Sequence, residues 1–325
     1  MVNLRPNSLS EFIGQKQILE ELSIYISSVY QRGDVFPHTL FIGAPGLGKT
    51  TLARLIALEL KREFKITSGP VLDKPGVIAG ILTSLKEGDI LFIDEIHRLP
   101  KPCQELLYSA MEDFALDILI GKNQTAKTIR ITLPKFTLIG ATNKPNLLLE
   151  PLIDRFHLSF RLEYYIEEEL KLILQKAAKA LNMILTDEVA LKLAKASKGI
   201  PRQALNLLRR LREFVYHKRK VAKVRKIEIK ESEVAEFFKL LDIDEWGLTP
   251  SDRRCLLTLY KLYNGGPVGL NALALASKIS PEELETICEP SLIRLGFLAR
   301  TKRGRILTKL GEEYLKKRNL LNVSF

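Results

Sequence analysis

The stretch GAPGLGKT, residues 43–50, matches the pattern G-x-x-x-x-G-K-[ST] of loops that hold nucleotide phosphates. It follows the β-prone run HTLFIG and opens the helical run TTLARLIALELK, as such a loop requires. Gly46 and Gly48 let backbone N–H groups close around phosphate oxygens, and Lys49 reaches the β- and γ-phosphates. The Thr50 hydroxyl can ligate Mg²⁺. The stretch therefore predicts a nucleotide site that uses Mg²⁺.

The sequence around this loop alternates short β-like runs with helical patterns over residues 38–160. The β-like runs are HTLFIG, FKIT, DILFID and FTLIGAT, and the helical ones are TTLARLIALELK and CQELLYSAME. Such alternation is typical of a parallel sheet flanked by helices. The fold class predicted for this part of the chain is therefore α/β.

The run ILFIDEIH, residues 90–97, is an apolar strand that ends in adjacent acids. Ligands of open α/β sheets bind at this carboxyl edge. Asp94 would hold the Mg²⁺ shell, and Glu95 would orient or deprotonate the attacking water. The letters DEIH also occur in DExH helicases, but the segment after residue 164 is too short for their second core domain.

Polar residues after later strands complete the predicted catalytic set. Asn143 follows the buried-type run TLIGAT and could hydrogen-bond the γ-phosphate or the water. Arg155 precedes a further strand in EPLIDRFHLSF and is a candidate arginine finger acting on a neighbouring subunit. In GIPRQALNLLRR, Pro201 and Arg202 begin a helix from which an arginine could sense the nucleotide, although this pattern alone favours an ordinary surface arginine.

The periodicity changes twice along the chain, which predicts three domains. An ATPase domain spans residues 1–162, an all-helical lid spans 163–242, and residues 243–325 form the third. In this last domain, helical runs precede FLARTKRGRILT, which is typical of a strand, a basic tip and a strand. Helices followed by such a ribbon predict a winged-helix domain.

The winged helix would bind DNA through its basic ribbon, which contains Arg300, Lys302, Arg303 and Arg305. The preceding helix begins PEELETICEP, and its acids would repel phosphates if they faced DNA. We predict that they lie in its exposed half: Glu282, Glu283, Glu285 and Glu289. Sequence-independent contacts from the ribbon to the DNA backbone are therefore expected.

Composition supports a polyanionic partner and a soluble protein. The chain has 325 residues and a net charge of +12, which favours nucleic acid as a partner. The densest basic cluster, residues 217–230, fits a solvated helix end and loop about as well as a nucleic-acid contact. No apolar run is long enough to cross a membrane and no signal peptide is recognisable, so a cytoplasmic location is expected.

Neither cysteine nor histidine spacing indicates a disulfide framework or a metal site. The cysteines are expected to be free thiols: Cys103, Cys255 and Cys288.

The stretch ALDILIGKNQTAKTIRI, residues 115–131, predicts a β-hairpin whose turn is GKNQT. Nothing in this stretch predicts a catalytic role. It lies between the acidic strand and the Asn143 strand.

The order of these features resembles AAA+ ATPases, and further segments narrow the resemblance to the RuvB family. These segments are LRPNSLSEFIGQ, GLGKTTLA, LFIDEIHRL, AMEDFALDILIGK, PLIDRF, GGPVGL and EPSLIRLGFLARTKRGR. The resemblance spans residues 4–305. It implies a homohexameric ring that uses ATP to drive branch migration of Holliday junctions in bacterial DNA recombination, DNA repair and the SOS response. It also implies the partners RuvA, docked on the hairpin through Leu119 and Ile120, and RuvC.

The resemblance also assigns roles to individual residues. Leu4, Arg5, Ile13, Gly14, Tyr165 and Pro201 would frame adenine; Gly46, Leu47, Gly48, Lys49, Thr50 and Thr51 would bind phosphates and Mg²⁺; Glu112, Asp113 and Phe114 would lie near the nucleotide. Arg155 would serve the neighbouring subunit and Arg202 its own. Arg300, Arg303 and Arg305 would contact DNA. Relatives typically carry arginine at position 153 and threonine at position 143, where this chain has Ile153 and Asn143.

Two alternative functions are considered. A clamp-loader or initiator-like AAA+ ATPase would also bind DNA but would load another protein, and the full series of segments disfavours it. A non-hydrolysing DNA-binding scaffold is disfavoured because Lys49, Asp94, Glu95 and Arg155 are all present.

Overall fold

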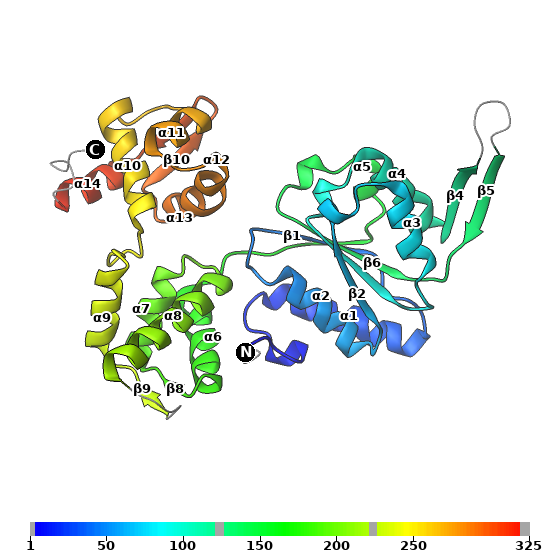
Figure 1. Cartoon of the computed structure of the whole chain (residues 1–325), viewed down its shortest axis with the longest axis horizontal. Coiled ribbons are helices and arrows are strands. Elements are labelled where there is room, and N and C mark those ends of the chain that lie inside the picture. The colour runs from blue at the N-terminus through cyan, green and yellow to red at the C-terminus, as the bar shows by residue number, and fades with distance from the viewer. Residues whose placement is uncertain (1–3, 121–126, 221–225, 319–325) are drawn as a thin grey trace. The chain divides into compact units, whose positions relative to one another are not determined.

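The computed structural model describes residues 4–120, 127–220 and 226–318, which form two compact units (Figure 1). The first unit ends at Tyr165 and the second begins at Ile166. Within the described ranges, no helix is long and apolar enough to span a membrane.

A parallel sheet forms the centre of the first unit, with strands in the order β2-β3-β6-β1-β7. Its strands are β1 (Thr39–Ile42), β2 (Phe64–Ser68), β3 (Ile90–Asp94), β6 (Thr137–Thr142) and β7 (Leu158–Arg161). Every residue of β6 and all of β3 except Asp94 are buried, because helices cover both faces of the sheet. The predicted α/β fold is confirmed.

Figure 1 shows α1 and α2 on one face of this sheet and α3 and α4 on the other. The helices of the first unit are α1 (Lys16–Arg32), α2 (Lys49–Glu59), α3 (Pro75–Thr83), α4 (Lys101–Glu112) and α5 (Glu150–Ile153), with short 3-10 turns at Leu9–Glu11, Gly69–Val71, Ile96–Arg98 and Pro145–Leu147. One core cluster joins α3, α4 and α5 to the sheet. Ile153, where the family resemblance implies arginine, packs against this cluster and so has an apolar role.

The predicted hairpin is confirmed as β4 (Ala115–Ile120) and β5 (Lys127–Thr132), which pair antiparallel outside the main sheet. Leu116 is buried at its base. The predicted turn GKNQT lies outside the described residues. The backbone of Leu119 and Ile120 belongs to β4, but their side chains lie outside the described part of the structure.

The second unit begins with the lid, whose helices are α6 (Glu167–Ala180), α7 (Asp187–Ala196), α8 (Pro201–Arg219) and α9 (Glu231–Leu240). The lid also contains a short parallel pair, β8 (Met183–Ile184) with β9 (Ile227–Glu228). The expectation of an all-helical lid therefore needs this small correction. Strands of two residues are too short to show an alternating pattern in the sequence.

The rest of the second unit has the predicted winged-helix order. Its elements are α10 (Pro250–Tyr263), α11 (Leu270–Ser277), α12 (Pro281–Glu283), the π-helical turn η6 (Leu284–Cys288), α13 (Glu289–Arg294), β10 (Leu298–Thr301), β11 (Gly304–Leu307) and α14 (Lys309–Lys317). Phe297 stacks on Tyr314 with ring centroids 4.9 Å apart, which fixes α14 against the base of the ribbon. The ribbon β10–β11 is the predicted strand, tip and strand.

Candidate nucleotide site and DNA-binding ribbon

The phosphate loop joins β1 to α2 and holds its lysine in place. Lys49 is only 9% exposed, and its Nζ donates to the carbonyl oxygens of Gly43 at 2.7 Å and Ala44 at 3.0 Å. Gly48 has φ of 111°, and a Cβ there would lie 3.0 Å from the ring of Phe12. The loop thus requires glycine at this position and presents an ammonium beside the N-terminus of α2, where phosphates bind.

The acidic pair stands at the carboxyl edge of the sheet, next to this loop. Asp94 ends β3, and its Oδ1 accepts a hydrogen bond from the backbone N–H of Glu95 at 3.0 Å. Glu95 has a left-handed backbone with φ of 51°, and its half-exposed side chain lies 3.5 Å from Arg98. The turn therefore separates the two carboxylates into different environments, as metal binding and water activation require.

Asn143 directly follows β6, which pairs with both β1 and β3. Its Oδ1 is buried and accepts no hydrogen bond within the described structure. Buried polar atoms are normally paired, and an orphaned one at a sheet edge marks a place for a ligand or water. The neighbouring Thr142 hydroxyl lies 3.0 Å from Nδ1 of His97, a contact that the sequence did not suggest. Burial is the main reason why the pKa of His97 lies below 6.5.

The N-terminal segment lies against the phosphate loop. Gln15 and Glu163 form reciprocal hydrogen bonds of 2.7 and 3.1 Å, which tie this segment to the end of the first unit. The Tyr165 hydroxyl donates to the carbonyl of Leu47 at 3.1 Å. Ile13 and Gly14 lie in this tied segment, and Leu4 and Arg5 precede it.

Phe12 was missed by the sequence analysis, although its ring contacts the Gly48 position. An isolated aromatic residue gives no signal that it will pack on a loop 36 positions later. Of the predicted adenine residues, Tyr165 contacts the phosphate loop directly, and Phe12 adds a second aromatic contact to this loop.

Arg155 lies at the opposite, amino edge of the sheet. It precedes β7, and its guanidinium donates to Glu112 at 2.7 Å and to the Pro151 carbonyl at 2.7 Å. The guanidinium also stacks 4.7 Å from the ring centroid of Tyr108. Since β7 pairs with β1 along its whole length of four residues, roughly 13 Å of strand separate this edge from the phosphate loop.

The end of α4 confirms this location. The Leu138 N–H donates to Nδ1 of His38 at 2.8 Å, so Nε2 carries the proton and donates to the Met111 carbonyl at 3.1 Å. His38 stands directly before β1, which anchors the end of α4 at the amino edge. Burial lowers the pKa of His38 to about 4, so this ring is neutral near pH 7.

Glu112, Asp113 and Phe114 therefore lie at the amino edge of the sheet, away from the phosphate loop. Asp113 pairs with Arg130 of β5 at 2.6 Å, and Phe114 packs on His38 and Phe136. Their predicted position near a nucleotide stays a prediction. Pro201 and exposed Arg202 form the first turn of α8, in the second unit.

The basic ribbon of the winged helix is only partly available to DNA. Arg300 and Arg303 are exposed, and Arg300 has Glu285 3.9 Å away. Arg305 is 6% exposed, and its Nε donates to Glu289 at 2.5 Å. The burial has a structural cause, because β11 pairs with β10 on one side and bridges Val268 on the other.

These contacts change two expectations. The prediction that Arg305 touches DNA does not fit its buried pairing with Glu289. The prediction of an exposed acidic helix is wrong for Glu289, which is 2% exposed, whereas Glu282 is exposed. Arginines of the ribbon therefore compensate part of the acidic charge of this helix.

The basic stretch 217–230 has a partly structural role. Lys218 pairs with Glu236 at 2.5 Å, and Arg219 pairs with largely buried Glu233 at 2.7 Å. Residues 221–225 lie outside the described ranges. The prediction of free thiols is confirmed, since Cys103, Cys255 and Cys288 are unpaired and buried.

Models of known protein families match three consecutive parts of the chain. The family model described as the Holliday junction DNA helicase RuvB P-loop domain matches residues 4–162, the RuvB AAA lid domain matches 165–244, and the RuvB C-terminal winged helix domain matches 245–316.

Relatives and solved structures agree with these models. The chain is 47% identical over 314 residues to the Holliday junction branch migration complex subunit RuvB of Fervidobacterium nodosum, covering 96% of this chain and 88% of the relative. The corresponding subunit of Thermotoga maritima is 47% identical over 313 residues, covering 96% and 92%. A structure of the Thermotoga maritima RuvB Holliday junction branch migration motor has a TM-score of 0.85 and 44% identity, covering 96% of this chain and 98% of the other. The chain belongs to the RuvB family.

Proposed function

We propose that this chain hydrolyses ATP to drive branch migration of Holliday junctions, and that it moves duplex DNA. The observation that carries the proposal is that Lys49, Asp94, Glu95 and Asn143 lie at one edge of the sheet in a chain that also contains a winged helix. Release of phosphate from ATP, measured with and without junction DNA, tests it. If junction DNA did not change the turnover of ATP, an ATPase that does not act on DNA would be favoured. If no ATP were hydrolysed, a non-hydrolysing DNA-binding scaffold would be favoured.

The described residues fit ATP and Mg²⁺. The ammonium of Lys49 and the N-terminus of α2 suit the phosphates, and Asp94 with the Thr50 hydroxyl supplies hard oxygen ligands of the kind that Mg²⁺ uses together with substrate phosphates. Gly46, Leu47, Gly48 and Thr51 belong to the same loop. When bound, Mg²⁺ would offset charge on the phosphates.

The polar groups around this site have different roles in hydrolysis. Glu95 accepts a proton from the attacking water, and the orphaned Oδ1 of Asn143 accepts a hydrogen bond that orients this water. Tyr165, Ile13 and Gly14 hold the base. Pro201 and Arg202 are further nucleotide-binding residues that the family resemblance implies.

Arg155 completes the site of a neighbouring subunit rather than its own. Its position at the amino edge supports this proposal, because the sheet separates it from its own phosphate loop. The homohexameric ring implied by the family would place Glu112, Asp113 and Phe114 at the same junction between subunits.

We also propose a cytoplasmic, bacterial location and roles in recombination, repair and the SOS response.

DNA contacts are proposed for Arg300 and Arg303 of the ribbon, with Arg305 holding the ribbon to α13. Replacing Arg300 and Arg303 with alanine should weaken binding similarly on unrelated duplexes, because phosphate contacts carry no sequence information. The slope of log K against log salt should fall by about one unit for each lost contact. Binding titrations on two unrelated duplexes at several salt concentrations measure both effects.

The matched control for this experiment is Lys316→Gln, which removes a cation of the same domain that pairs with Glu312 at 2.6 Å on α14. It should leave affinity and salt slope unchanged. If the ribbon variant lost affinity for one duplex only, or kept its salt slope, the proposed backbone contacts would be wrong.

RuvA is proposed to dock on the hairpin β4–β5, and RuvC is a further partner that the resemblance implies. Leu119→Asp with Ile120→Asp should remove stimulation by RuvA and spare intrinsic turnover, because burying unpaired carboxylates in an apolar contact costs several kcal/mol. Pull-down with RuvA and ATPase assays with and without RuvA check this. Thr128→Asp, opposite Leu119 in the register, places a charge on the same ribbon as a control. Unchanged RuvA binding by the double variant would reject this docking site.

A clamp-loader or initiator function is the second candidate. The match of all three RuvB family models along the chain favours the branch migration motor instead.

A further inference from the structure

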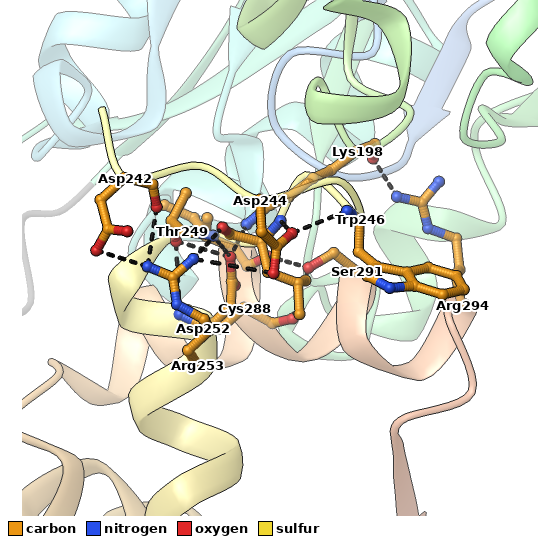
Figure 2. Close-up of polar contacts among 12 residues, drawn as sticks. Lys198, Asp242, Asp244, Trp246, Thr249, Asp252, Arg253, Cys288, Ser291 and Arg294 are labelled. Atoms are coloured by element: carbon orange, nitrogen blue, oxygen red, sulfur yellow. Dashed lines mark hydrogen bonds and ion pairs between the residues drawn. The ribbon is translucent and has the colours of Figure 1, made fainter. Parts of the chain in front are cut away.

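The winged helix is tied to the lid at the turn that precedes α8. Lys198 lies in this turn with a left-handed φ of 54°, and it is 8% exposed. Its Nζ forms an ion pair with Asp252 of α10, whose side chain is fully buried (Figure 2). Breaking a buried ion pair from one side is strongly destabilising, because the remaining charge would be buried without a partner. The pair therefore holds the two domains together.

Asp252 is held rigidly on its own side of this tie. Its Oδ2 also accepts hydrogen bonds from the backbone N–H of Thr249 at 2.8 Å and from the Thr249 hydroxyl at 2.7 Å. These contacts form the N-terminal cap of α10. Any displacement of α10 therefore moves the carboxylate that Lys198 contacts.

A second contact reaches the backbone of the same lysine. Arg294, on α13 of the winged helix, donates from its guanidinium to the Lys198 carbonyl (Figure 2). Lys198 is thus held by its side chain from α10 and by its main chain from α13. Both helices belong to the domain proposed to bind DNA.

The segment between the lid and the winged helix is also held by contacts on both sides. Gly247 packs so closely that a Cβ there would lie 2.7 Å from Cα of Ala196, and Lys195 stacks 4.9 Å from the ring centroid of Trp246. On the other side, buried Asp244 accepts from the Tyr314 hydroxyl at 2.5 Å. The segment is therefore clamped between α7 and α14.

The position of Lys198 in the sequence connects these contacts to the start of α8. Only Gly199 and Ile200 separate it from the start of α8, and the Ile200 N–H bonds back to the Ser197 carbonyl at 3.0 Å. We propose that Lys198 is a positioning residue which couples the winged helix to the start of α8, so that movement of DNA and movement of Arg202 are linked. The coupling part rests on the proposed function.

The test uses an unlocked variant, Lys198→Met with Asp252→Asn and Arg294→Gln, in the full chain. It removes both charges of the buried pair together, and the asparagine oxygen can still cap α10. Thermal melting verifies that it folds. The control variant, Lys192→Met with Glu231→Gln, removes an ion pair of 2.7 Å that lies within the lid and is half exposed.

The first measurement is structural and needs no ATPase activity. Spin labels on Leu172→Cys and Leu275→Cys, at side chains that are 50% and 83% exposed, report the distance between lid and winged helix by pulsed electron resonance. We expect one narrow distribution for the parent and the control and a broad one for the unlocked variant. A distribution that stays narrow in the unlocked variant would overturn the tie.

The second measurement is the stimulation of ATP turnover by junction DNA. Without DNA, the kcat and KM for ATP should match those of the parent, because none of the changed residues is proposed to contact nucleotide. Stimulation by junction DNA should fall by about fivefold or more, the range typical of lost coupling between sites. A broadened distribution with full DNA stimulation would overturn the coupling role. A parent without any turnover would refute the proposed function, whereas the distance distributions would still decide the tie.

Discussion

Glu95→Gln is expected to lower ATP turnover by about 10² to 10⁴-fold, because an amide cannot accept the proton of the attacking water. Binding of ATP should persist, since Lys49 and Asp94 are unchanged and the amide has the shape of the carboxylate. Single-turnover phosphate release measures the loss, and binding of a fluorescent ATP analogue measures what remains. Lys49→Ala should behave differently and weaken binding itself.

The structure offers a matched control for this experiment. Glu95 lies 3.5 Å from Arg98, so Glu95→Gln removes an ion pair as well as a base. Arg98→Gln breaks the same pair and leaves the carboxylate in place. It should retain turnover, because exposed pairs contribute little to stability. Near-normal turnover of Glu95→Gln, or an equal loss in Arg98→Gln, would refute the role of Glu95 as the base.

Arg155→Ala is expected to lower turnover by about 10³ to 10⁵-fold, the typical effect of an arginine finger. Affinity for ATP should change little, because a finger stabilises the charge of the transition state more than that of the bound substrate. Steady-state turnover and ATP titration of the assembled protein separate the two quantities. Arg130→Ala is the control, since it removes another arginine paired with an acid near the end of α4.

Mixing of variants tests whether Arg155 acts on a neighbouring subunit. Subunits with Arg155→Ala keep an intact phosphate loop, and subunits with Lys49→Ala keep an intact finger. Mixed assemblies should regain turnover, because one junction then combines both intact parts. Absence of any rescue would mean that Arg155 serves its own subunit or only supports the fold.

Much of the nucleotide site could be predicted from the sequence because each part follows a local rule. Lys49 belongs to a spaced glycine pattern, and Asp94 and Asn143 each end an apolar run. In a parallel sheet, the ends of such runs meet at one edge whatever their separation in the sequence. No detailed contact was needed to bring these residues together.

The buried arginine of the ribbon could not be predicted in this way. Arg305 lies in a basic tip that resembles a solvated turn, and its burial depends on Val268 and Glu289, which come from elements distant in the sequence. The contact of Phe12 with the phosphate loop and the pairing of Lys198 with Asp252 have the same origin. Such contacts arise from tertiary packing and leave no periodic trace in the chain.

The placement of the phosphate loop and of Arg155 at opposite edges of one sheet has a consequence for symmetry. If each subunit gives its arginine to one neighbour and receives an arginine from another, as in the proposed ring, the two faces of the subunit differ and the interface is heterologous. Such a head-to-tail interface generates either a closed ring or an open filament, depending on whether the rotation between subunits closes. The angle between neighbours, rather than the chemistry of either face, then decides how many active sites are complete.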